Sequence, residues 1–134
     1  MLVLRPETVR FDGEPWAGVD AITVERTAAR AVTEFGDLGP FAAFADVPEQ
    51  NVTVQVAAVS ERAWAEPVQP GDTGDLVFEA SLGRTDAGRS RVTVACVVTR
   101  VKQDWRVGGA GRVVTLAAVS ADGGSADPVQ IEEL

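Results

Sequence analysis

The stretch RVTVACVVTRV, Arg91–Val101, predicts a β-strand in the middle of a sheet. Period-two alternation in an extended chain places one set of apolar residues on one face. That set is Val92, Val94, Cys96 and Val98. The opposite face is apolar as well, because it carries Ala95, Val97 and Val101. A strand with two apolar faces is typical of a central position that is covered on both sides.

Three further runs alternate in the same way and are predicted to be the rest of the sheet core. They are NVTVQV at 51–56, DLVFEASL at 75–82 and RVVTLAAV at 112–119. The glycine-rich sequence GGAG, which precedes the last run, predicts a hairpin turn. Dipeptides such as Asp12-Gly13, Gly39-Pro40 and Pro70-Gly71 mark turns elsewhere.

The segment Ile22–Phe35 fits both a helix and a strand, since its alanines have helical spacing but its first residues are β-branched. We interpret it as a long strand that runs into a loop at Gly39–Gln50. The predicted fold is mainly β, with residues 1–134 forming a single domain. Its architecture is an antiparallel β-sandwich or flattened barrel of about six to eight strands, with a long hairpin loop and at most one short helix.

Composition restricts the class of protein. The chain has 134 residues, of which 46% are hydrophobic and 24% charged, as expected of a globular domain. No apolar run approaches the roughly 20 residues that span a bilayer, and the N-terminus lacks a secretory signal pattern. The sequence therefore predicts a soluble protein made in the cytoplasm. Its single cysteine, Cys96, is expected to be a buried thiol.

Catalytic chemistry has little support. The chain has no histidine and no tyrosine, so it cannot assemble a Ser-His-Asp or Cys-His site, and one cysteine cannot hold zinc. Carboxylate pairs are uninformative among 20 acidic residues. We therefore expect no enzyme activity, and no catalytic, metal or cofactor-binding residue is predicted.

Charge is unevenly distributed along the chain, whose net charge is −8. Residues 31–83 contain nine acids and one base, whereas residues 84–112 contain seven bases and two acids. A net acidic surface does not bind nucleic acid by neutralising phosphates. The asymmetry has two interpretations. It reflects ordinary solvated faces, or surfaces of opposite sign meet between copies of the chain.

Aromatic residues in turn-rich segments raise a similar choice. In GPFAAFADVPEQ, Gly39–Gln50, the side chains of Phe41 and Phe44 pack either against their own core or against another chain. The three tryptophans, Trp16, Trp64 and Trp105, lie near turns. They either cap the ends of a sandwich or form a platform for a glycan.

Four features follow one another along the chain: an early FDG turn, the loop EFGDLGPFAAFADVPEQNVTVQV, the hairpin RVTVACVVTRVKQDWRVGGAGRVVTLAAVSADG and the ending ADPVQI. In this order of elements, from about Val9 to Ile131, the chain resembles the tail tube proteins of tailed bacteriophages. The helix of many such proteins would lie within 28–35 or near 62–65. A related terminator or baseplate ring subunit is the other possibility within this group.

The resemblance implies a structural virion protein, assembled in the host cytoplasm, whose hexameric rings stack into the tail tube. Its partners would be copies of itself and other tail proteins, with DNA passing through an acidic channel without specific binding. The residues expected at the subunit interface are Phe41, Phe44, Asp46 and Val47. Those expected to face the lumen are Thr53, Gln55, Asp75 and Glu79. The alternative from another class is a monomeric β-sandwich module that binds a glycan or a peptide.

Overall fold

The structure is a computed structural model that describes residues 1–59, 68–81, 88–106 and 109–134. Strands make up about 70% of the described residues, which contain no helix, so the mainly-β prediction is confirmed. The strands are β1 (Leu2–Leu4), β2 (Glu7–Phe11), β3 (Glu14–Pro15), β4 (Val19–Phe35), β5 (Ala42–Ala58), β6 (Thr73–Ala80), β7 (Ser90–Arg106), β8 (Gly109–Ala118) and β9 (Val129–Glu133).

All strands belong to one antiparallel sheet that is not closed into a barrel. The order is β1-β4-β5-β8-β7-β6-β2-β3, and β9 pairs with β7. Strand β7 has three partners: β6 pairs with its first half, while β9 and then β8 pair with successive parts of it. The central position predicted for Arg91–Val101 is confirmed, but the expected cover on both faces is not, because Ala95 and Val97 are only partly buried. A register shift between Val98 and Arg100 turns Val101 toward the core rather than to the face of Ala95 and Val97. The sheet has nine strands rather than the expected six to eight, because short β1, β3 and β9 add to the predicted runs.

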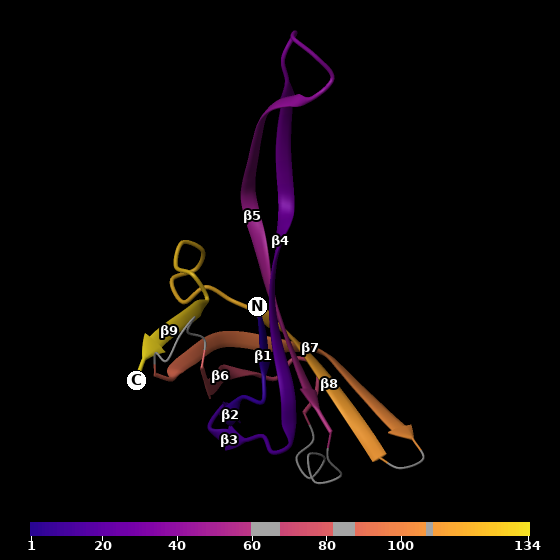
Figure 1. Ribbon diagram of the computed structural model, residues 1–134, viewed down its shortest axis with the longest axis vertical. Coiled ribbons are helices and arrows are strands. Elements are labelled where there is room, and N and C mark those ends of the chain that lie inside the picture. The colour runs from indigo at the N-terminus through magenta and orange to yellow at the C-terminus, as the bar shows by residue number, and fades with distance from the viewer. Residues whose placement is uncertain (60–67, 82–87, 107–108) are drawn as a thin grey trace.

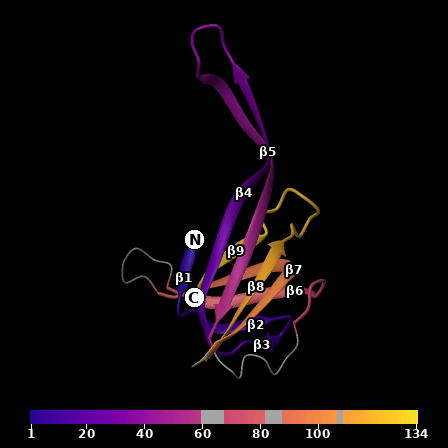
Figure 2. The ribbon, with the colours of Figure 1, turned by 90° about the vertical axis from the view of Figure 1, so that its right-hand side faces the viewer.

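The core lies on the concave side of this sheet, where β4, β5 and β8 pass in front of β6, β7 and β2 (Figure 2). The alternation predicted from the sequence is confirmed, since Val54, Leu76 and Val94 are all fully buried. The largest side chains with almost no exposure are Phe78, Ile22, Leu76, Leu116, Val54, Val56, Val92, Val94, Val98 and Val114. Leu82, expected on the same face of its strand, lies outside the described residues.

Two local expectations are corrected. Gly109 and Gly111 were expected in a hairpin turn, but they pair with Arg106 and Asp104 in the ladder between β7 and β8. Long β7 continues to offer hydrogen-bonding partners at these positions, so the strands extend beyond their apolar residues. Residues 28–35, one of the two places where a helix would lie, are strand, and residues 62–65 lie outside the described residues.

The most conspicuous feature is a hairpin that projects from the sheet (Figures 1 and 2). Strands β4 and β5 pair with each other from Val19–Ala58 to Phe35–Ala42, but β8 pairs with β5 only over its last six residues, 53–58. Every residue from 25 to 51 is exposed, and we call this segment the arm. The long strand interpretation of Ile22–Phe35 is confirmed. The predicted loop at Gly39–Gln50 is wrong in part, because β5 already begins at Ala42.

Candidate functional site

The arm exposes large apolar side chains near its tip. The exposed fractions are 67% for Phe35, 103% for Leu38, 85% for Phe41 and 53% for Phe44. Of the two interpretations of Phe41 and Phe44, packing against their own core is therefore wrong for the chain as described. Large apolar side chains gathered in an exposed segment are typical of a surface that another molecule covers.

The tip of the arm is also acidic. Near its middle, the Arg30 guanidinium lies 3.9 Å from a carboxylate oxygen of Glu49, and both side chains are solvated. Between these two residues, positions 31–48 contain three acids, Glu34, Asp37 and Asp46, and no base. The acidic residues that are close in the sequence are therefore also close in space, because they lie together on a projecting hairpin.

Cross-strand pairing defines one face of the arm in detail. Val32 lies opposite Asp46, and Glu34 lies opposite Phe44, so these four residues share a face. Asp46 Oδ1 accepts a hydrogen bond of 2.9 Å from the backbone N–H of Val47, which holds its carboxylate beside the strand. This face therefore alternates apolar and acidic groups. All four residues expected at a subunit interface, Phe41, Phe44, Asp46 and Val47, are exposed here.

The four residues expected to face a lumen lie on two separate strands. Thr53 and Gln55 are on β5, whereas Asp75 and Glu79 are on β6, and β8 and β7 lie between them. All four project from the face of the sheet opposite the core, because they alternate with buried residues. They therefore lie on two different parts of the outer side of the sheet and do not form one cluster.

That outer face is mixed in charge rather than uniformly acidic. Glu79 pairs with Arg91 at 3.3 Å and with Arg89 at 3.4 Å, so its charge is compensated locally. Asp75 is exposed and has no ion-pair partner among the described residues. Sequence reasoning could not anticipate the pairing of Glu79, because Arg89 and Arg91 reach it only through the register of β6 with β7.

Trp16 is a packed side chain with 7% exposure. Its ring lies 5.1 Å from the ring of Phe11, and the Arg112 guanidinium lies over it at 5.6 Å. Burial lowers the pKa of Arg112, a cost that contact with the electron-rich ring face offsets. Trp16 is thus unavailable as a glycan platform. Trp64 and the side chain of Trp105 lie outside the described part of the chain.

Cys96 is a buried free thiol, as predicted. Its Sγ donates to the carbonyl oxygen of Gly74 at 3.6 Å, and burial raises the pKa of the thiol from 9.0 to about 11. Nucleophilic chemistry requires the thiolate, which this environment disfavours.

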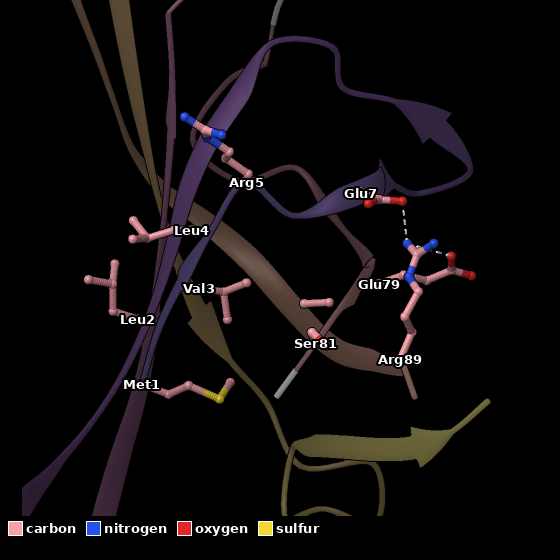
Figure 3. Close-up of a pocket in the computed structure, with 10 residues that line it drawn as sticks. Met1, Leu2, Val3, Leu4, Arg5, Glu7, Glu79, Ser81 and Arg89 are labelled. Carbon is pink, nitrogen blue, oxygen red and sulfur yellow. Dashed lines mark hydrogen bonds and ion pairs between the residues drawn. The ribbon is translucent and has the colours of Figure 1, made fainter. Parts of the chain in front are cut away.

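A cavity of about 580 Å³ lies between β1 and the end of β6, and sequence reasoning missed it (Figure 3). Val3 points toward Ser81 across it, whereas Leu2 and Leu4 point the opposite way (Figure 3). Arg89 bridges Glu7 and Glu79 at its rim, so its charged groups already satisfy one another.

The loop at 119–128 fastens the root of the arm. Arg26 on β4 contacts both carboxylate oxygens of Asp127, at 3.0 and 3.1 Å. Asp122 organises the loop by accepting hydrogen bonds from the Ser125 and Ser120 hydroxyls and from backbone N–H groups at 124–126. These bonds, that of the Ser125 hydroxyl first, lower the pKa of its carboxyl. The contact between Arg26 and the loop therefore stabilises the base of the arm.

Within the described residues, no group of three or more histidine, cysteine or acidic side chains could hold a metal ion. In the same ranges, no helix is long and apolar enough to cross a membrane. No protein-family model matches the chain, and no curated protein sequence is significantly similar to it.

Proposed function

We propose that this chain is a self-assembling structural protein of a phage tail, a subunit whose hexameric rings stack into the tail tube. The observation that carries the proposal is the arm, a 27-residue segment, 25–51, in which every residue is exposed. An isolated two-stranded hairpin is at best marginally stable in water, so one that carries exposed phenylalanines needs a partner surface. The sequence resemblance to tail tube proteins supports this kind of assembly.

The rest of the molecule supports a structural role. Three described side chains that could have bound a ligand or taken part in catalysis are packed or paired. Trp16 is in the core, the Cys96 thiol is buried, and Arg89 forms ion pairs with two carboxylates. The sheet is also open, since it does not close into a barrel. Pairing between copies would cover edges that otherwise template aggregation.

The first test is the mass of the purified chain in solution, measured by light scattering over a hundredfold range of concentration. We expect rings or longer assemblies, with the assembled fraction rising with concentration. A monomer at every concentration would contradict the proposal and favour the ligand-binding module.

The channel is assigned to the outer face of the sheet, with Thr53, Gln55, Asp75 and Glu79 as the residues nearest the DNA. Replacing Thr53 and Asp75 with lysine is expected to leave assembly intact and to slow genome ejection at low salt, because each lysine offers a phosphate contact. Glu79 is left unchanged, since its pairing with Arg91 contributes to the sheet. The measurement is ejection rate against ionic strength in particles that carry the variant chain.

Thr53→Ser with Asp75→Asn is the matched control, because it changes the same positions without adding cations. The control should eject at the wild-type rate. Equal ejection rates for the lysine variant and this control at low salt, in properly assembled tails, would mean that the outer face does not line the channel.

A further inference from the structure

We propose that the acidic face of the arm docks on a basic patch formed by Arg100 and Lys102 on β7 of the next copy. This inference rests on the proposed function and names the surface that receives the arm. It follows from the charges, spacing and positions of the two surfaces in the fold.

The basic patch lies on the outer face of the second half of β7. Arg100 pairs in register with Thr115 and Lys102 with Val113, so the two cations project from the same face. Both are exposed, and neither forms an ion pair within the described residues. These cations lie beside the half-buried Val113. Together they form a surface that suits a partner with both acidic and apolar side chains.

The spacing of charges matches across the two surfaces. Arg100 and Lys102 are two residues apart on one strand, which separates their backbones by about 7 Å. Glu34 and Asp46 are diagonal neighbours across the arm, because Glu34 lies opposite Phe44, and such pairs are also about 7–8 Å apart. Two carboxylates can therefore meet two cations at once, while Val32 and Phe44 cover the adjacent apolar residues.

The neighbouring charges are consistent with this match. The hairpin segment 99–113 contains four bases and one acid, a net charge of +3, whereas segment 31–48 of the arm contains three acids and no base, a net charge of −3. Asp104, half-buried, is the acid in the basic segment and follows Lys102 on the same face. Because like charges repel, Asp104 disfavours a carboxylate above it. The arm carboxylates are therefore favoured over Arg100 and Lys102.

The two surfaces also lie toward opposite ends of the molecule. The arm extends to one end of the long axis, and the β7–β8 hairpin extends away from it toward the other end (Figure 1). When identical subunits bind through two different surfaces, each copy adds another in the same direction. The chain of copies grows without limit unless the rotation between copies closes it into a ring. An acidic end that meets a basic end therefore generates a directed stack.

The docking patch and the proposed channel share the outer face without overlap. Thr53 pairs in register with Ala117 on β8, which in turn pairs with Val97 on β7, nearer the middle of the sheet. Gln55 lies beside Thr115, which borders Arg100, so Gln55 is at the boundary between channel and patch.

Charge reversal provides a test with internal controls. The first variant, Glu34→Lys with Asp46→Lys, makes the arm basic. The second, Arg100→Glu with Lys102→Glu, makes the patch acidic. All four positions are exposed, so both variants should remain folded, which circular dichroism verifies.

Each variant alone is expected to require at least about 100-fold more protein for assembly, because its docking surfaces carry like charges. An equimolar mixture should assemble, since the basic arm of the first matches the acidic patch of the second and the remaining two surfaces also match. A chain with all four substitutions should assemble by itself for the same reason. Sedimentation measures the assembled fraction in each case.

Two results would overturn the inference: wild-type assembly by either variant alone, or no recovery in the mixture and in the fourfold variant. In both cases the proposed function stands if the unaltered chain assembles. If the unaltered chain stays monomeric, the proposed function and this inference both fail.

Discussion

Chains in which Phe41 and Phe44 are both replaced by serine are expected to remain folded monomers. The two phenyl rings are 85% and 53% exposed in the isolated chain, so their removal leaves the core intact. Aromatic anchors at interfaces commonly contribute about 2 kcal/mol or more each. Loss of two weakens association by roughly a thousandfold, enough to dissociate rings at micromolar concentration.

The matched control replaces Ala42 and Ala45 with serine. These residues lie on the same arm and are exposed, but they carry no large apolar group. Solution mass separates the two variants, and circular dichroism reports on their folding. Assembly of the phenylalanine variant at wild-type concentrations would show that the arm does not hold subunits together.

Phe78→Ala is expected to have the largest effect on the stability of the fold. Phe78 has 0% exposure in the centre of the core, and truncation of such a ring costs about 3–5 kcal/mol because a cavity remains. Urea unfolding followed by circular dichroism measures the loss. A domain at the low end of ordinary stability, about 5 kcal/mol, would be left partly unfolded near room temperature.

Phe41→Ala is the control for this experiment, because it removes the same atoms from an exposed position. Its free energy of unfolding should stay within about 0.5 kcal/mol of the wild-type value under conditions that keep both chains monomeric. Equal destabilisation by the two substitutions would mean that Phe41 packs in the core and that the arm does not project.

Sequence reasoning predicted the sheet because alternation records burial directly. Val52, Val54 and Val56 alternate with polar residues, and one face of a half-buried strand requires this pattern. Phe78 and Cys96 were placed in the core on the same grounds, and the structure confirms both.

The arm was harder to recognise, because its strands are exposed on both faces and so lack alternation. Residues 42–50 contain alanines, a proline, one phenylalanine and one valine without a regular period. Their pairing with β4 shifts register at several points along the arm, which no local pattern predicts. The ion pairs of Glu79 and the cavity beside β1 depend on contacts between strands distant in sequence, which no local pattern encodes.

Negative-stain imaging of the purified, unaltered chain decides whether it forms a tube. We expect rings with sixfold symmetry that stack into tubes with a central channel, and no such particles for the variant without Phe41 and Phe44. Uniform single-subunit particles from the unaltered chain, at concentrations well above micromolar, would contradict it.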